Sequence, residues 1–157
     1  MSDETKRDLQ PQYLELARGR MKKSQFNALV GFTLDRLYEG GAVMSLIVEE
    51  HHRQVQNVVH GGVIAALADT AAALAAYTAV LPGTELVTVE LKINYLLPIA
   101  DGRIEAEGKV LRAGRNFVVA ECDVRNASGA LAAKALMTFG AVGPRATEIA
   151  GVTKTDG

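Results

Sequence analysis

The sequence predicts an α+β protein in which one long apolar helix is wrapped by an antiparallel sheet of five or six strands. Two observations carry this prediction. Residues 63–81 are rich in Ala and Leu and contain neither Gly nor Pro, which favours a helix. Residues 31–50 and 85–142 instead hold runs with strand-like alternation, separated by turns that contain Gly or Pro.

Length and composition indicate one ordinary globular domain. At 157 residues the chain can bury a core, and we expect a helical segment over 1–30, the main domain over 31–142 and a flexible tail over 143–157. The net charge of −1 shows no bias toward nucleic acid or acidic membranes. The polar start lacks a signal peptide, and a single cysteine, Cys122, fits a reducing compartment, so we expect a cytoplasmic protein.

The first part of the chain is expected to hold two helices and a hairpin. Leu9–Met21 has a partial apolar face at helical spacing, and Phe26–Val30 can form one further turn. Gly31–Tyr38 and Ala42–Glu50 then read as two strands joined at Gly40-Gly41.

The central helix follows His60-Gly61-Gly62 and is expected to run to Pro82, which cannot continue it. It is apolar on every side, so we expect it to be buried on every side. Asp69 nevertheless sits in its middle, where an unpaired charge costs several kcal/mol. This charge also argues against a membrane span. A structural Asp is one interpretation, but a working carboxylate explains the cost better.

The start of this helix has the groups that an anion needs. Gly61 and Gly62 allow close approach of a ligand, and the first N–H groups of a helix have no internal partner, which suits a developing oxyanion. Asp69 lies nine residues beyond His60, or about 13 Å along the helix. One carbonyl cannot touch both ends, so the spacing predicts a homodimer with two equivalent sites.

After the helix, the chain is expected to form four strands. Glu85–Leu96 alternates, and we expect its two faces to hold the following sets: Val87, Val89, Leu91, Ile93 and Tyr95 on one, and Thr88, Glu90, Lys92 and Asn94 on the other. Arg103–Leu111, Phe117–Asn126 and Leu131–Val142 follow as the remaining strands, with a hairpin turn over Arg112–Asn116.

Taken together, four motifs resemble the hotdog-fold acyl-CoA thioesterases of the PaaI-type, or phenylacetate-degradation, group. They are His60-Gly61-Gly62, Ala66–Thr70, Val87–Tyr95 and Pro98. The resemblance covers residues 31–142. It implies the hotdog fold, an acyl-CoA substrate, hydrolysis to a free acid and coenzyme A, no further cofactor, and homodimers that pair into a homotetramer.

The resemblance also implies roles for individual residues. Asp69 would act as general base on water or as nucleophile, and the two routes stay open. The Gly61 N–H of the other copy would bind the oxyanion. His60 and Gln54 would lie near the thioester, and Thr88 would orient water or Asp69. An ordinary strand threonine is the alternative for Thr88.

Two positions in the loop before the helix depart from the family pattern. The family usually has Asn six residues before its His and Gly three before, where this chain has Gln54 and Asn57. Asn tolerates the left-handed backbone region, so Asn57 can replace the glycine there. Gln54 keeps the carboxamide on a side chain that is longer by one methylene. With Gly62, Asn57 is expected to contact the substrate.

Basic residues near one hairpin turn are the candidates for holding the phosphates of coenzyme A. Arg112 and Arg115 can bind phosphate oxygens in forked fashion, with help from Lys109 or Lys92. A solvated polar turn is the alternative. We expect no metal site, because the adjacent pair His51-His52 points to opposite sides of an extended chain.

Two other functions remain compatible with the sequence. A dehydratase or hydratase acting on acyl thioesters would use His60 as acid and base on a substrate carbon. A non-catalytic acyl-CoA-binding protein would bind the ligand without hydrolysis, but the chain shows no output domain and keeps Asp69.

Overall fold

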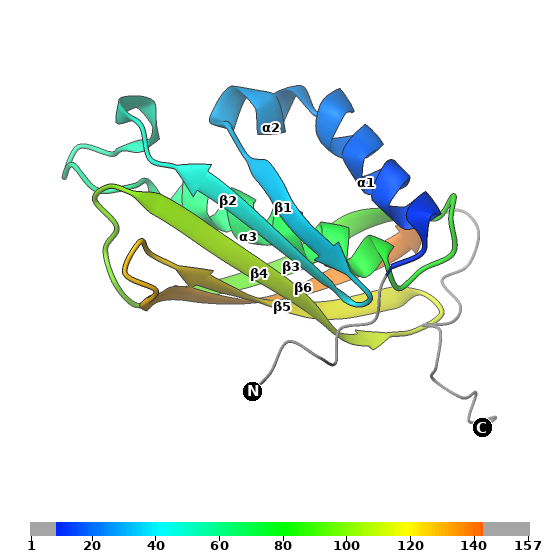
Figure 1. The fold of residues 1–157 in the computed structure, drawn as a ribbon. Helices are drawn as coiled ribbons and strands as arrows, with labels where there is room; N and C mark the ends of the chain where they lie inside the picture. Colours follow the sequence, from blue (N-terminus) through cyan, green and yellow to red (C-terminus); the bar gives the residue numbers. More distant parts are fainter. Residues whose placement is uncertain (1–8, 143–157) are drawn as a thin grey trace.

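The central helix α3 (Gly61–Tyr77) lies against one face of a six-stranded antiparallel sheet in the computed structural model, which describes residues 9–142 (Figure 1). The other elements are α1 (Pro11–Lys23), α2 (Gln25–Val30), β1 (Thr33–Tyr38), β2 (Gly41–Ile47), a 3-10 turn (Glu50–His52), β3 (Glu85–Tyr95), β4 (Arg103–Ala113), β5 (Phe117–Arg125) and β6 (Leu131–Val142). The strand order is β1-β2-β4-β5-β6-β3. The predicted architecture is therefore confirmed; the predicted tail and the polar start lie outside the described residues.

The central helix ends earlier than the sequence predicts. Helix α3 stops at Tyr77, five residues before Pro82. The Thr78 hydroxyl donates to the carbonyl of Ala75 at 2.7 Å and accepts the N–H of Gly40 at 2.8 Å. This side chain satisfies a terminal carbonyl and ties the helix end to the β1–β2 turn, so the helix needs no proline to stop.

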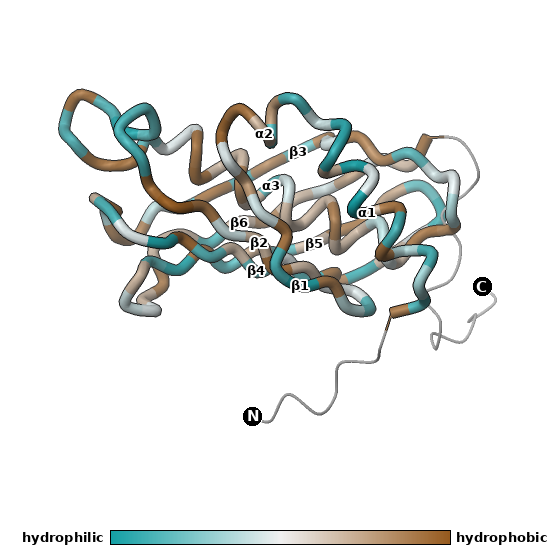
Figure 2. Tube along the Cα trace, turned by 45° about the horizontal axis from the view of Figure 1, so that its top comes forward, coloured by the Kyte–Doolittle hydropathy of each residue, from teal (hydrophilic) through white to brown (hydrophobic). Residues whose placement is uncertain are grey.

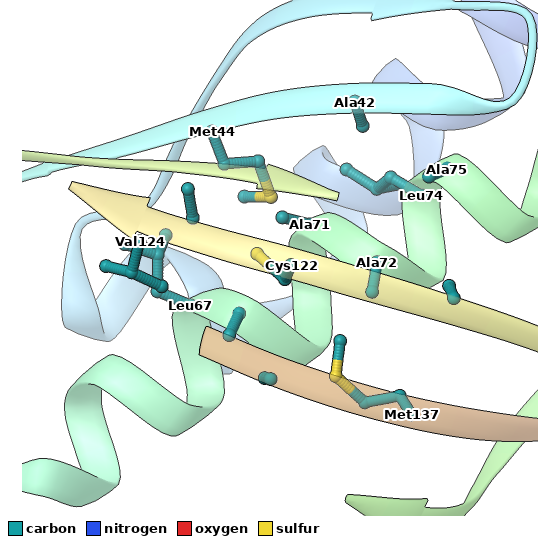
Figure 3. Close-up of a cluster of buried hydrophobic side chains, with 14 of the residues drawn as sticks. Ala42, Met44, Leu67, Ala71, Ala72, Leu74, Ala75, Cys122, Val124 and Met137 are labelled. Carbon is teal, nitrogen blue, oxygen red and sulfur yellow. The ribbon is translucent and has the colours of Figure 1, made fainter. Parts of the chain in front are cut away.

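Small residues let α3 pack closely on the sheet. Figure 3 shows its alanines, among them Ala71 and Ala72, facing side chains of the strands such as Met44 and Cys122. The hydropathy colouring along the chain changes from hydrophilic over much of α1 to mostly hydrophobic on α3 (Figure 2). Burial raises the pKa of the Cys122 thiol to about 12, so this cysteine is an inert core residue.

Helix α3 approaches the sheet closely at Gly108 of β4, and this contact leads to a stability prediction. A Cβ at this position would lie 2.6 Å from the backbone nitrogen of Ala72 and 2.7 Å from the carbonyl oxygen of Ala71. Neither atom can move without shifting α3. We expect Gly108→Ala to lower the free energy of unfolding by about 2–3 kcal/mol, measured by urea denaturation.

Gly19 of α1 provides the matched control for this substitution. Nothing lies within 4 Å of a Cβ built on it, and it is inside a helix. Gly19→Ala should therefore stabilise the protein by about 0.5–1 kcal/mol. Equal effects of the two substitutions would contradict the proposed contact between Gly108 and α3.

A β-bulge overturns the predicted faces of β3. Thr88 pairs with Phe139 of β6, and Glu90 pairs with Thr138, so Val89 is an extra residue. Beyond the bulge, Leu91 and Ile93 pack against the core, whereas Val87 and Val89 are exposed. The predicted face is thus split, and Thr88 lies on the helix side together with Leu91, Ile93 and Tyr95.

Helix α3 is also not buried on every side. Gly62 is exposed, and Ala66, Asp69, Ala73 and Tyr77 are only half-buried. These residues recur at helical spacing along one face, while the opposite face packs on the sheet. The prediction of complete burial was wrong for a single chain because the sheet covers only part of the helix circumference, and Asp69 lies on the uncovered part.

Candidate active site

The carboxylate of Asp69 is held by a single side chain. Thr88 Oγ1 donates to Asp69 Oδ1 at 3.0 Å and stands 3.2 Å from Oδ2. Burial raises the pKa of Asp69 above its ordinary 3.8, and the Thr88 hydrogen bond opposes that rise. No other hydrogen bond to this carboxylate is found within residues 9–142. The acid is therefore oriented, partly desolvated and free to accept a proton.

The start of α3 leaves one backbone donor open. His60 is the N-cap, and its Nδ1 accepts the N–H of Gly62 at 2.9 Å. The carbonyl of His60 accepts the N–H of Val63 at 2.9 Å. The N–H of Gly61 has no acceptor in the described part of the chain. It is the donor that an oxyanion could use.

Tyr95 contacts this helix start, which sequence reasoning did not predict. Its hydroxyl donates to the carbonyl of Gly61 at 2.7 Å, and a Cβ on Gly61 would lie 3.1 Å from the Tyr95 ring. Tyr95 was assigned only to a strand face, since nothing in the sequence pairs the end of β3 with the start of α3. The contact joins residues 34 positions apart.

The loop before α3 is a closed hairpin that presents Gln54 and Asn57. The N–H of Gln54 donates to Val58 O at 2.8 Å, and the N–H of Asn57 donates to Gln54 O at 2.9 Å. Asn57 has φ 60°, so the prediction that Asn replaces glycine in the left-handed region is confirmed. Both side chains are exposed, beside the helix start.

His52 is a buried structural residue that braces this loop. Its Nδ1 accepts the N–H of Glu49 at 2.9 Å, so its Nε2 donates to the carbonyl of Val30 at 2.7 Å. The backbone carbonyl of His52 accepts the N–H of His60 at 2.8 Å. Both ring nitrogens are thus occupied, and the histidine links α2 to the entrance of α3.

A hollow of about 440 Å³ adjoins the helix start. It is lined mainly by apolar side chains: Gln54, Val58, Val59, Gly61, Ile64, Tyr95, Leu96, Leu97, Pro98 and Ile99. A flexible apolar group could lie there next to the Gly61 donor.

The predicted residues form two groups at different places on the molecule. Asp69 and Thr88 form one pair, and the second group gathers at the start of α3: Gln54, Asn57, His60, Gly61 and Gly62. Asp69 is eight residues beyond Gly61, or about 12 Å along the helix. One chain therefore presents two half-sites, a proton acceptor and a backbone donor, which cannot act on one bond.

The basic residues lie at the far end of the sheet. Arg112 lies near the end of β4 rather than in the turn, and Arg115 lies in the turn between β4 and β5. This turn is at the end of the sheet where β3 begins, whereas α3 begins where β3 ends (Figure 1). Both arginines are exposed. Lys109 is paired with Glu107 at 3.2 Å, and Lys92 donates to Asn94 at 3.0 Å. Within one chain, the predicted phosphate group and the helix start are not brought together.

Two further features of residues 9–142 concern metals and membranes. No three His, Cys, Asp or Glu side chains in this part cluster closely enough to hold a metal ion. None of its helices combines the length and apolar character that crossing a bilayer requires.

Comparisons with known proteins point to one family. The family model of the thioesterase superfamily matches residues 56–133. SSO2140 of Saccharolobus solfataricus, which is named as an esterase, is 37% identical over 115 residues, covering 73% of this chain and 81% of that protein. YigI of Salmonella typhimurium, named as a medium/long-chain acyl-CoA thioesterase, is 30% identical over 131 residues, covering 73% and 83%.

Solved structures support the same fold. PaaI of Escherichia coli, from the phenylacetic acid degradation operon, superposes with a TM-score of 0.80 at 22% identity, covering 89% of this chain and 100% of that one. The hotdog fold expected from the sequence motifs is confirmed.

Proposed function

This chain belongs to the thioesterase superfamily, and from that premise we propose that it hydrolyses acyl-CoA thioesters to a free acid and coenzyme A. The name of the YigI relative suggests medium or long acyl chains as the first substrates to test. The apolar hollow beside Gly61 suits such a chain.

The single observation that carries the proposal is the Asp69–Thr88 pair on the uncovered face of α3. In the general-base route, Asp69 removes a proton from water as the water oxygen attacks the thioester carbonyl carbon. The carbonyl oxygen gains the electron pair, and its return breaks the C–S bond and releases the thiolate of coenzyme A, which takes up a proton. In the nucleophile route, Asp69 attacks the carbonyl carbon and displaces the thiolate of coenzyme A, which takes up a proton. Water then hydrolyses the resulting mixed anhydride to the free acid and restores the Asp69 carboxylate.

The two half-sites require a second copy of the chain. Strand β3 is at the edge of the sheet, and Val87 and Val89 on it are 53% and 60% exposed. Such an edge favours pairing with another strand. If two β3 strands pair antiparallel with Thr88 of one copy opposite Tyr95 of the other, Gly61 of one copy approaches Asp69 of the other. Both Thr88 and Tyr95 lie on the helix side, as opposed residues must.

The same pairing of two β3 strands would bring Arg112 and Arg115 toward the active site of the other copy. Phe117, just after the turn, pairs with Gly140 of β6, which pairs with Val87 of β3. Arg112 and Arg115 therefore lie toward the end of the sheet where the helix start of the other copy would arrive. We assign them, with Lys109, to the phosphates of coenzyme A. Pairs of dimers would form a homotetramer, in the cytoplasm.

His60 and Gln54 take positioning roles at the thioester. His60 Nδ1 already accepts a hydrogen bond as the cap of α3, which leaves only Nε2 for a ligand. A dehydratase needs a histidine that both removes and returns protons at a substrate carbon. The hydrogen-bonded His60 fits a thioesterase better, and Asp69 distinguishes the enzyme from a binding protein.

Subunit complementation tests this proposal. Asp69→Asn removes the base, and Gly61→Pro removes the open N–H. A mixed dimer has one chain with Gly61→Pro (the Pro chain) and one with Asp69→Asn (the Asn chain). The site that joins Asp69 of the Pro chain to Gly61 of the Asn chain is intact. We expect each variant alone to be nearly inactive and an equal mixture after subunit exchange to recover about a quarter of wild-type activity, because half of the dimers are mixed and each has one intact site.

Release of coenzyme A from a panel of acyl- and aryl-acyl-CoAs is the readout. Absence of recovery, with both variants folded and dimeric, would mean that the two groups do not meet across an interface. Binding of acyl-CoA without any thiol release by the wild type would favour the binding-protein alternative, and hydration or dehydration of the acyl chain would favour the other enzyme class.

A further inference from the structure

Tyr95 holds the peptide group between Gly61 and Gly62, which directly follows the N–H of Gly61. Its hydroxyl donates to the carbonyl of Gly61 at 2.7 Å, while the N–H of the same peptide group, on Gly62, donates to His60 at 2.9 Å. Both ends of this peptide are thus occupied. The preceding peptide carries the Gly61 N–H, which has no acceptor among residues 9–142.

Gly61 needs such an anchor more than another residue would. Glycine lacks a Cβ and moves through a wide range of φ and ψ, so an N–H on glycine is poorly oriented by the residue itself. A donor stabilises an oxyanion well only when its direction is set before the reaction. The Tyr95 ring also lies 3.1 Å from the position of a Cβ on Gly61, so it closes one side of the glycine.

Strand β3 connects this anchor to the carboxylate. Thr88 on the same strand holds Asp69, and the bulge at Val89 turns both Thr88 and Tyr95 to the helix side. We infer that Tyr95 is a positioning residue for the oxyanion donor: it orients Gly61 for the site that contains Asp69 of the other copy. This inference rests on the proposed function.

The protonation state of Tyr95 agrees with a donor role. Burial raises the pKa of the Tyr95 hydroxyl above its ordinary 10.0, so the group keeps its proton at neutral pH. Its acceptor is a backbone carbonyl, which cannot donate in return.

Tyr95→Phe removes the hydroxyl and keeps the ring. We expect kcat for acyl-CoA hydrolysis to fall about 10-fold with KM within about twofold of the wild type, because the donor is misdirected but not lost. Tyr13→Phe is the matched control: the Tyr13 hydroxyl also donates to a backbone carbonyl, that of Val80 at 3.3 Å, but on α1. Its kcat should be unchanged.

Complementation separates positioning from a general structural role. In mixed dimers of Asp69→Asn and Gly61→Pro chains, the intact site uses Tyr95 of the Asn chain. Tyr95→Phe added to the Asn chain should lower the recovered activity about 10-fold, and added to the Pro chain it should have no effect. Equal loss in both placements, or loss in neither, would overturn the inference.

An NMR measurement keeps the test independent of the reaction. The 15N order parameters of Gly61 and Gly62 should fall in Tyr95→Phe and stay unchanged in Tyr13→Phe. If the wild type hydrolyses thioesters but the mixtures recover no activity, the proposed pairing of two β3 strands is wrong. The kcat and KM of Tyr95→Phe then test the positioning role of Tyr95. If the wild type hydrolyses no thioester, the proposed function fails and the positioning role with it, while unchanged order parameters would also refute the anchor.

Discussion

Replacing Asp69 with Asn should lower kcat for acyl-CoA hydrolysis at least ~100-fold, because the substitution removes the proton acceptor and keeps the size of the side chain. Asn can still accept the hydrogen bond that Thr88 donates to Asp69 at 3.0 Å, so the local geometry should persist. Thiol release measured with 5,5′-dithiobis(2-nitrobenzoate), beside ligand binding by calorimetry, separates loss of chemistry from loss of affinity.

Asp123→Asn is the control for this variant. Asp123 is on β5 and pairs with Lys134 at 2.7 Å, away from α3. Its activity should match that of the wild type. Thiol release by Asp69→Asn at a rate close to that of the wild type would remove Asp69 from the mechanism under both the base and the nucleophile routes.

The raised pKa of Asp69 fixes the sign of two pH effects. Activity needs the ionised carboxylate, so kcat/KM should rise with pH through a midpoint above 3.8. The folded state binds this proton more tightly than the unfolded state, so the wild type loses stability as pH rises from 3.8 through the folded pKa. Asp69→Asn should therefore be the more stable protein at pH 7, and this difference should vanish below pH 3.8.

Replacing Gly61 with Pro should lower kcat about 10²–10³-fold, the usual loss for one oxyanion donor. Proline has no N–H, and the first position of a helix tolerates it. His60 before it has φ −60° and ψ 132°, which suits a residue that precedes proline. Since the Gly61 N–H has no acceptor in the described part of the chain, its loss removes no hydrogen bond of the fold seen there.

Gly61→Ala separates the missing N–H from the added bulk. Both variants place a Cβ about 3.1 Å from the Tyr95 ring, but only Ala keeps the N–H. We expect Ala to retain at least about a tenth of wild-type kcat, with Pro far below it. Circular dichroism and thermal unfolding should show that both variants fold. Equal kcat values for Ala and Pro would show that the Gly61 N–H does not bind the oxyanion.

Local signals explain what could be predicted from the sequence. The Ala-rich run specifies α3 because helix propensity acts within a few residues, and the turn residues delimit six strands. The motifs that contain Gly61 and Asp69 pointed to a thioesterase, and their spacing along one helix predicted a homodimer, which stays a prediction. The left-handed backbone conformation of Asn57 could be predicted because asparagine tolerates that region.

Contacts between distant segments decided the rest. Whether Thr88 faces Asp69 depends on the bulge, which exists only where β3 pairs with β6, so a strict alternation misplaced it. The exposed face of α3 depends on how far the sheet wraps it. The Tyr95–Gly61 bond joins a strand end to a helix start, and the helix-to-sheet contact at Gly108 likewise depends on α3 and β4 crossing there. Short-range propensity and residue chemistry specify the helices, the strands and the reactive groups. Which of these groups meet depends on strand register and helix packing, and both arise only when distant segments of the chain come together.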